Sequence, residues 1–559
     1  ELQTIWRLAN LRELAAELQR LLTQQTAAVP MRVTPETTTA PLAASRPVFA
    51  PLSAGQQRLY FLDRVLTPRH TYNVSLAVRL PTPLSVDLLR TALEQVMARH
   101  EQLRMCIQEQ DGPPRQRILP WVEAPLEEHA LPADTDQADS TIRRLVDQEV
   151  QRPFLLSQAP LFRVLYIRLG QSASALGIIW HHIATDGASV AIFLSELSTA
   201  YQAAQHGEQR ELAAGPSYAL YAQRQREWLQ SEASSAQRSY WASKLAGLPS
   251  LELPSDRPVT RQRTERGGLI PFSIPSAVVT RIDALAKELR TTPFVIVIAA
   301  WSALLSRLSG QQDFAIGSTM LGRSEESVRD AIGFFVNTLP LRCLLHGEPT
   351  AQQYIERLHQ ELWSALDHQE LPLDEIVRVV TPDRQPGFIG SPLFRTCVSY
   401  NEFREALDSF GGQPAVVVCD PVIERVGGTS KFDLTLSVMR HPSGFSAALE
   451  YSSDLFDEET IKQWAKRFLL LLSALVEQPQ QKVYALPLLS ADETQRMLYE
   501  WNDTTAAYPQ DRCIHQIFED QVTKTPDTVA LVYQDMQLSY RALNAKANQL
   551  AHRLRTLGV

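Results

Sequence analysis

The sequence contains few cysteines, and their spacing gives no metal-binding or disulfide pattern. Five occur among 559 residues, and no two of them form a CxxC pair. This usage is typical of a protein from a reducing compartment, and it predicts neither a zinc site nor a disulfide framework. The cysteines are Cys106, Cys343, Cys397, Cys419 and Cys513.

Long apolar runs and an excess of positive charge are also missing. The longest apolar run, FVIVIAAW at 294–301, is too short to span a bilayer and predicts a buried helix. The first residues, ELQTIWRLAN, lack the basic-then-apolar pattern of a signal peptide. A net charge of −8 leaves no broad basic surface for neutralising phosphates. We therefore expect a cytoplasmic protein that binds neither membranes nor nucleic acids.

Several catalytic signatures are absent as well. The chain has no GxSxG elbow, no Cys–His grouping of recognisable spacing and no GxxxxGK[ST] phosphate loop. A covalent acyl-enzyme and nucleotide hydrolysis therefore have no support in this sequence. Direct transfer between two bound substrates remains compatible with it.

Length and pattern predict a large α/β body. At roughly 150 residues per domain, the chain is long enough for three or four compact units. Strand-like stretches at 161–169 and 175–180 alternate with helical stretches at 86–100 and 349–369. Such alternation across 48–485 indicates an α/β fold, which we expect to have two lobes.

Both ends of the chain look different from this body. Residues 1–25 repeat leucine at three- and four-residue steps and predict a helix, while 26–47 are rich in Thr, Ala and Pro and predict a linker. The pattern weakens again over 486–511. A strand-like VALVYQDMQLSY and a helix follow within 512–559. We expect each end to be a fragment of a neighbouring domain.

The stretch WHHIATDG, 180–187, holds the most chemistry-bearing residues. His181 and His182 follow an apolar strand, and adjacent side chains on an extended chain point to opposite faces. Only one of them can easily face a pocket, which disfavours a shared metal ion. Two interpretations stay open. Either the histidines simply end a strand before an Asp186–Gly187 turn, or one accepts a proton during acyl transfer, with Asp186 as a buried anchor that needs a cationic partner.

The segment HHIATDG resembles the HHxxxDG motif of the condensation domains of nonribosomal peptide synthetases. Six further segments are similar to motifs of that family and occur in the family's order. They are LSAGQQRLYFLDR (52–64), RHEQLR (99–104), YWASKLAGLPSLELPSDRP (240–258), IGFFVNTLPLR (332–342), DHQELPLDEIV (367–377) and SPLFRTCVSYN (391–401).

The two ends agree with this resemblance. LANLRELAAEL (8–18) is similar to the last helix of a peptidyl carrier domain, and WNDTTAAYP (501–509) with the segments after it resembles the entry to an adenylation domain. The resemblance implies the following division. A carrier fragment spans 1–25, a linker 26–47, the condensation N-terminal lobe 48–225, its C-terminal lobe 226–485, a second linker 486–511, and an adenylation fragment 512–559.

The resemblance implies two lobes, each like chloramphenicol acetyltransferase, arranged as a V around a tunnel. Phosphopantetheine arms of an upstream and a downstream carrier domain enter it from opposite faces, and no cofactor is bound covalently to this chain. The amine of the acceptor aminoacyl thioester attacks the donor thioester and forms an amide. The partners are therefore the two carrier domains and the adjacent adenylation domain.

Residue roles follow from the same resemblance. His182 faces the reactants as base or positioning group, and His181 supports the loop. Asp186 is a structural anchor whose partner is Arg323, and the Gly187 N–H is either an oxyanion donor or part of the turn. The residues expected to support the tunnel are Arg58, Tyr60, Arg99, Arg104, Asn337 and Gln369, the two amides by satisfying backbone groups.

The resemblance also bears on the subtype of condensation domain and on rival functions. The intact histidine pair disfavours heterocyclisation, the adenylation-like end disfavours epimerisation, and the motifs favour joining an L donor to an L acceptor. Glu370, Leu373 and Asp374 depart from the family's HQDxPFE motif, as do Met105, Cys106 and Ile107 from its RHExLRTxF motif. A silent docking domain and an acyltransferase that uses coenzyme A are the alternatives.

Overall fold

The computed structural model divides the chain into two compact units, residues 1–488 and 489–559. It describes residues 48–559 except 110–111, 132–136, 209–212, 259–263, 382–391, 403–407, 421–426 and 442–443. The predicted carrier helix at 1–25 and the linker at 26–47 lie outside the described residues.

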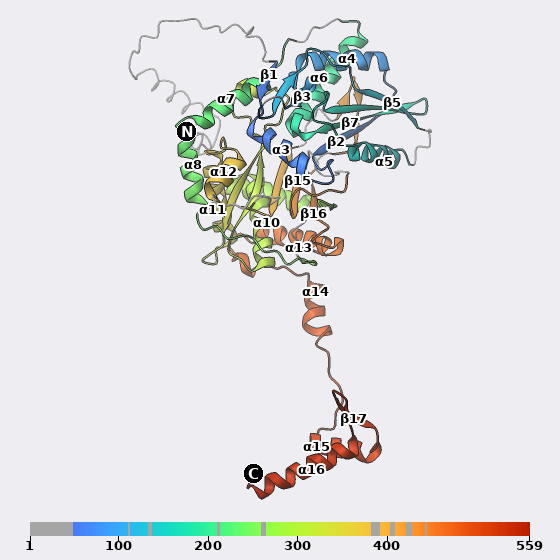
Figure 1. The fold of residues 1–559 in the computed structure, drawn as a ribbon, viewed down its shortest axis with the longest axis vertical. Helices are drawn as coiled ribbons and strands as arrows, with labels where there is room; N and C mark the ends of the chain where they lie inside the picture. The colour runs from blue at the N-terminus through green and yellow to red at the C-terminus, as the bar shows by residue number, and fades with distance from the viewer. Residues whose placement is uncertain are drawn as a thin grey trace. The chain divides into compact units, whose positions relative to one another are not determined.

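The first lobe of the larger unit is a five-stranded sheet with helices against it (Figure 1). The strand order is β14-β2-β7-β6-β5, antiparallel except for the β5–β6 pair. The strands are β2 (Asn73–Leu80), β5 (Leu126–Leu131), β6 (Phe162–Leu169), β7 (Ala173–His181) and β14 (Val416–Cys419). The helices are α3 (Ala54–Val65), α4 (Val86–Arg99), α5 (Ala138–Gln151) and α6 (Gly187–Gln205). A small sheet joins β1 (Phe49–Pro51), β4 (Arg115–Ile118) and β3 (Met105–Gln108).

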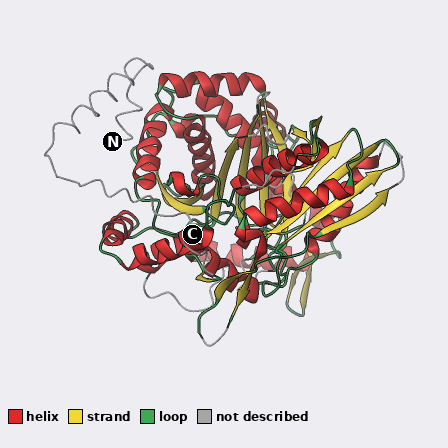
Figure 2. Cartoon of the chain, turned by 90° about the horizontal axis from the view of Figure 1, so that it is seen from above, coloured by secondary structure: helices red, strands yellow, loops and turns green. Residues whose placement is uncertain are grey.

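The second lobe contains a six-stranded mixed sheet. Figure 2 shows the strands of the chain in yellow and its helices in red. The order of the six-stranded sheet is β10-β9-β11-β15-β16-β8, with β11 parallel to both neighbours. The strands are β8 (Gly267–Ile274), β9 (Asp313–Met320), β10 (Asn337–Leu344), β11 (Thr396–Glu402), β15 (Leu434–His441) and β16 (Gly444–Ser452). The helices are α8 (Ala233–Lys244), α9 (Ser276–Glu288), α10 (Pro293–Ser309), α11 (Ala351–Leu366), α12 (Leu373–Val380) and α13 (Glu458–Glu477). The two-lobed α/β prediction is confirmed.

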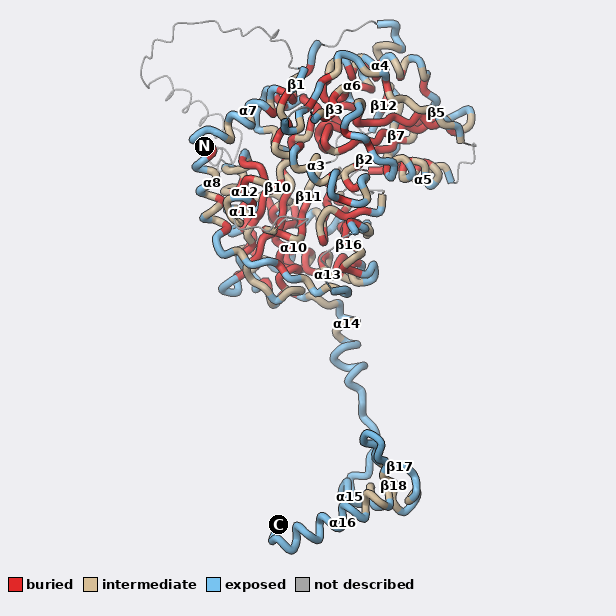
Figure 3. Tube along the Cα trace, viewed as in Figure 1, coloured by how far each residue is buried: buried red, intermediate tan, exposed pale blue. Residues whose placement is uncertain are grey.

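Helix α10 is the centre of the second lobe's core. Thr292 precedes it, Pro293 begins it with a backbone angle already suited to a helix, and Gly310 ends it at φ +73°. Every residue from Val295 to Ser306 is buried. A helix that is apolar on all sides must lie inside a protein or a membrane. The buried helix predicted at 294–301 is confirmed, with Phe294 partly buried (Figure 3).

Strand β14 belongs to the first lobe although it lies late in the chain. Val416 and Val417 pair with Arg79 and Val78 of β2, and Cys419 pairs with Ala77 after a register shift. β14 covers the edge of β2 that β7 does not pair. The predicted lobe boundaries, 48–225 and 226–485, assign β14 to the second lobe, whereas it pairs within the sheet of the first. The limit at 225 also falls inside one continuous helix, α7 (Tyr218–Gln230).

The connection from β9 to β10, residues 321–336, depends on a glycine. Gly322 has φ +64°, and a Cβ built there would lie 2.0 Å from the carbonyl oxygen of Phe335. Both the backbone angle and the close approach exclude a side chain. The turn at Gly322 therefore brings Arg323 next to the end of the same connection.

The smaller unit is a hairpin with two long helices. It comprises α14 (Ala491–Gln495), a π-helical turn (Arg496–Glu500), α15 (Ile514–Lys524), β17 (Val529–Tyr533), β18 (Met536–Ser539) and α16 (Tyr540–Thr556). The strand expected in VALVYQDMQLSY is two strands, because the chain reverses between Tyr533 and Met536, with Gln534 at φ +52°. No residue of these elements is buried within the unit.

Within the described ranges, no helix taken singly has the length and apolarity to cross a bilayer. Only α9 and α10 together meet that requirement, and they are bent by 110°.

We expect Gly322→Ala to destabilise the larger unit by at least about 2 kcal/mol, because a left-handed angle and a backbone clash act together. Gly310→Ala is the matched control, since Gly310 has φ +73° and no atom within 4 Å of a built Cβ. That control is expected to cost only about 1–2 kcal/mol. Denaturant unfolding measures both values. Equal losses would show that the contact with Phe335 is unimportant.

Candidate functional site

His181 is buried in the first lobe and holds the turn after β7. Its Nδ1 accepts a hydrogen bond from the Ile183 N–H at 3.1 Å, and its Nε2 lies 3.7 Å from Asp63 Oδ1. An Nδ1 that accepts has no proton, so the neutral ring carries its proton on Nε2, on the side of Asp63. The ring also packs edge-on against Phe154. The contacts of His181 agree with the loop-supporting role expected of it.

His182 takes the opposite direction and lines a cavity. Its Nδ1 lies 2.7 Å from the Thr185 carbonyl oxygen. A carbonyl only accepts, so Nδ1 must carry the proton, and Nε2 is the basic nitrogen of the neutral ring. The ring packs edge-on against Phe334 of the second lobe, with centroids 5.0 Å apart. The prediction that only one of the two histidines faces a pocket is confirmed.

Asp186 joins the two lobes through a buried ion pair with Arg323. Oδ1 lies 2.9 Å from Arg323 Nη2, and the two side chains are 0% and 7% exposed. Oδ1 also accepts a hydrogen bond from the Ser189 N–H, so Asp186 caps the start of α6. Oδ2 accepts a hydrogen bond from the Phe335 N–H at 3.0 Å. The structure brings together the aspartate and the arginine that the sequence paired.

Arg323 distributes its other donors over the same connection. Its Nη1 donates to the carbonyl oxygens of Val328 and Ala331 at 2.9 and 2.6 Å. Its guanidinium lies 4.1 Å from the centroid of the Phe335 ring. The buried Arg323 charge therefore fixes both the start of α6, through Asp186, and the β9–β10 connection, through its carbonyl oxygens.

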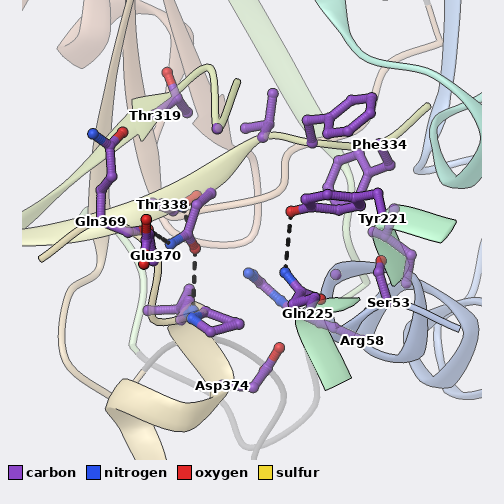
Figure 4. Close-up of a pocket in the computed structure, with 18 of the residues that line it drawn as sticks. Ser53, Arg58, Tyr221, Gln225, Thr319, Phe334, Thr338, Gln369, Glu370 and Asp374 are labelled. Atoms are coloured by element: carbon purple, nitrogen blue, oxygen red, sulfur yellow. Dashed lines mark hydrogen bonds between the residues drawn. The ribbon is translucent and has the colours of Figure 1, made fainter. Parts of the chain in front are cut away.

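The cavity lies between the lobes and has a volume of about 410 Å³ (Figure 4). The first lobe supplies His182 and parts of α3, the second supplies residues from β9, β10 and α12, and α7 closes one wall. Six aromatic side chains line it: Tyr72, Tyr221, Trp228, Phe334, Phe335 and Phe432. Apolar walls of this kind strengthen hydrogen bonds inside a site.

Charged groups at the cavity carry both signs. Arg58, Arg224 and Lys431 are cationic, and Glu325, Glu370 and Asp374 are anionic. Arg224 Nη1 lies 3.2 Å from Glu325 Oε2, in a pair whose side chains are half exposed. Across the described part of the chain, no group of three or more His, Cys, Asp or Glu side chains is placed to hold a metal ion.

Three of the expected supporting residues line the cavity, and the side chain of one of them, Asn337, is hydrogen-bonded to the backbone. Arg58 and Gln369 are wall residues. Asn337 also lines the cavity, but its side chain is used to fix the backbone near α12. Its Nδ2 donates to the carbonyl oxygens of Gln369 and Leu371, and its Oδ1 accepts from the Leu373 N–H. Asn337 therefore satisfies backbone groups, as expected.

The remaining expected residues lie outside the lining of this cavity. The Tyr60 hydroxyl donates to Glu109, Arg99 pairs with Glu196, and Arg104 Nε donates to the Met97 carbonyl oxygen at the end of α4. Gly187 is the exposed first residue of α6, with open space where a Cβ would be.

Sequence reasoning missed Tyr221, Gln225 and Phe334. Tyr221 and Gln225 are four residues apart on α7, and the Gln225 Nε2 donates to the Tyr221 hydroxyl. Phe334 packs where Gly55 has no side chain, since a Cβ there would lie 2.8 Å from Phe334 Cε1. The i, i+4 spacing was the only signal for the first pair, and it does not say which face of a helix meets a cavity.

Asp186→Asn is expected to lower the free energy of unfolding by about 3–5 kcal/mol, because it leaves the buried Arg323 charge uncompensated. Asp313→Asn is the matched control. It breaks a pair with Arg342 that lies within one lobe, with side chains about a fifth exposed. The control pair is bidentate but reaches solvent, and we expect its loss to cost about 1–2 kcal/mol. Chemical denaturation of the full chain compares them, and an Asp186→Asn variant as stable as the parent would rule out the anchor.

Known proteins are similar to this chain over most of its length. Residues 48–498 match the family model of the condensation domain. Malpinin synthetase of Mortierella alpina is 35% identical over 561 residues, which are 100% of this chain and 7% of that protein. Surfactin synthase subunit 1 of Bacillus subtilis (strain 168) is 34% identical over 511 residues, 91% of this chain and 14% of that protein. The chain thus spans only about a tenth of the length of these curated relatives.

Solved structures give the same fold. A four-domain nonribosomal peptide synthetase bound to AMP and glycine superposes with a TM-score of 0.76 at 23% identity, covering 92% of this chain and 39% of that one. The X-domain from teicoplanin biosynthesis has a TM-score of 0.70 at 25% identity, covering 80% of this chain and 99% of that one. With its two lobes like chloramphenicol acetyltransferase, this chain belongs to the condensation-domain family of nonribosomal peptide synthetases.

Proposed function

We propose that this chain forms an amide bond between two carrier-bound thioesters. The observation that carries this proposal is that His182 lines the cavity while the Thr185 carbonyl holds its Nδ1–H, so that Nε2 is the basic nitrogen of the neutral ring. The donor is an aminoacyl or peptidyl thioester on an upstream carrier domain. The acceptor is an aminoacyl thioester on a downstream carrier domain.

The reaction needs no nucleotide, because a thioester is already activated. The acceptor nitrogen attacks the donor carbonyl carbon, a C–N bond forms and the C–S bond breaks. The nitrogen loses one proton, which His182 Nε2 accepts and the departing thiolate finally receives. A free α-ammonium has a pKa of about 8, and burial against the aromatic walls of the cavity favours its neutral, nucleophilic form. Tethering of both substrates removes entropic cost, up to about 7–11 kcal/mol for well-oriented reactions.

Partners and subtype are part of the same proposal. Phosphopantetheine arms of the two carrier domains deliver the substrates, and no covalent cofactor is needed on this chain. Residues 1–25 belong to a carrier domain and 512–559 to an adenylation domain. The donor and acceptor both have the L configuration, as the motifs LPSDRP and GFFVNTLPLR favour.

A silent docking domain is the second candidate. The X-domain with the same fold has been solved in complex with OxyB, so the fold alone does not separate the two functions. The site favours catalysis. His182, its hydrogen bond to Thr185 and the Asp186–Arg323 anchor are all present, and a docking function requires none of them.

The test is dipeptide formation on a carrier domain. Donor and acceptor carriers loaded with L-aminoacyl-pantetheine are mixed with the full chain, and intact-mass spectrometry follows the acceptor. We expect His182→Ala to lower the rate by about 10²–10⁴-fold, since the proton acceptor is lost. His206→Ala is the control, because His206 is exposed at the end of α6. Its rate should equal the parent's.

Each outcome has one meaning. Product with the parent and little with His182→Ala supports amide formation through this histidine. Equal product with both variants keeps the function and removes His182 from the proton transfer. No product with the parent, across several L and D donors, favours the docking domain.

A further inference from the structure

The hydrogen bonds of Gln225 fix the direction in which its amide points. Gln225 Oε1 accepts from the backbone N–H of Ala54, at the start of α3, at 2.9 Å. The oxygen must face that donor, so the Nε2 group must face Tyr221, 3.1 Å away. An amide nitrogen only donates. The Tyr221 oxygen is therefore an acceptor in this bond.

The Tyr221 proton is consequently directed elsewhere. Burial raises the pKa of Tyr221 to about 12, so the phenol is neutral and keeps its proton at physiological pH. Over the residues that the structure describes, the bond accepted from Gln225 is the only hydrogen bond of this hydroxyl. Tyr221 is partly buried and lines the cavity, so the acceptor for its proton must come from whatever occupies that cavity. During the reaction that occupant is a bound ligand.

Tyr221 is held rigidly in the same cavity as His182. Its ring packs against Tyr218 and Phe335, with centroid distances of 5.4 and 4.8 Å. In Figure 4 its hydroxyl oxygen projects toward the open centre of the lining residues. A fixed donor in a site with aromatic walls stabilises negative charge on a ligand oxygen without having to reorganise.

We infer that the Tyr221 hydroxyl donates a hydrogen bond to the thioester carbonyl oxygen of a bound aminoacyl group. This assignment rests on the proposed function. The cavity then offers complementary groups. His182 Nε2 accepts a proton from the attacking amine, and Tyr221 donates to the oxygen on which negative charge develops. A thioester carbonyl is an acceptor without a proton, which fits a site whose open group is a donor.

The first test removes only the hydroxyl. Tyr221→Phe is expected to lower kcat/KM for dipeptide formation by about 10²–10³-fold, the cost of removing one donor to an oxygen that develops negative charge. Tyr484→Phe is the matched control, because its hydroxyl bonds Ser306 inside the second lobe and Tyr484 does not line the cavity. The control should keep the parent's kcat/KM. An unchanged kcat/KM in Tyr221→Phe overturns the inference.

The second test keeps the Tyr221 hydroxyl but turns its proton away from the substrate. In Gln225→Glu, one carboxylate oxygen can still accept from Ala54, and the other accepts the Tyr221 proton, which turns the hydroxyl away from the substrate. We expect kcat/KM to fall by about 10²–10³-fold, as in Tyr221→Phe. In the Tyr221→Phe background the same change should have no further effect. Additive losses would show that Gln225 acts independently, and they would overturn the inference.

The third test separates this inference from the proposed function. Binding is measured with an aminoacyl-pantetheine amide, which keeps the carbonyl, and with an analogue that carries CH₂ in its place. Tyr221→Phe should raise Kd about 3- to 10-fold for the first and leave the second unchanged. Equal effects on both analogues, or none, overturn the inference. A parent that binds the amide but makes no dipeptide removes the proposed function, while the Kd comparison still decides the role of Tyr221.

Discussion

The ion pair between Asp186 and Arg323 is the constraint on which the site depends. It is buried and crosses from the start of α6 in the first lobe to the β9–β10 connection of the second. Charges removed from water must be paired closely, so this pair tolerates little change in the distance between the lobes. The same carboxylate accepts from the Phe335 N–H, next to Phe334. The contact of Phe334 with the His182 ring is therefore set by the anchor.

Neighbouring polar residues around the site have different structural roles. His181 satisfies the backbone inside the first lobe, and His182 faces the cavity. Asn337 uses both ends of its amide on the backbone around α12. Tyr218 bonds Ser53 and the Phe334 carbonyl, whereas Tyr221, one turn later on α7, lines the cavity. In the His181–His182 and Tyr218–Tyr221 pairs, a polar residue that holds the chain stands beside one that lines the cavity.

Much of this was readable from sequence, because some signals are local. The apolar run at 294–301 predicted a buried helix, and an apolar strand before two histidines predicted that they face opposite ways. The need of a buried aspartate for a cation, together with the family resemblance, led to Arg323. Tyr221, Gln225 and Phe334 were not found, because their roles arise from the approach of α7 and the second lobe to α3. No spacing along the chain encodes that approach.

The pairing of the late strand β14 with β2 has a consequence for folding during synthesis. The first lobe's sheet gains its edge strand only when residues 416–419 exist. During synthesis from the N-terminus, β2 therefore presents an unpaired edge while more than half of the second lobe is being translated, and such edges invite pairing with other chains. The first lobe's sheet is therefore complete only after most of the second lobe has been synthesised. Recombining them between homologues at a junction near residue 225 would cut α7 and give the first lobe a foreign edge strand.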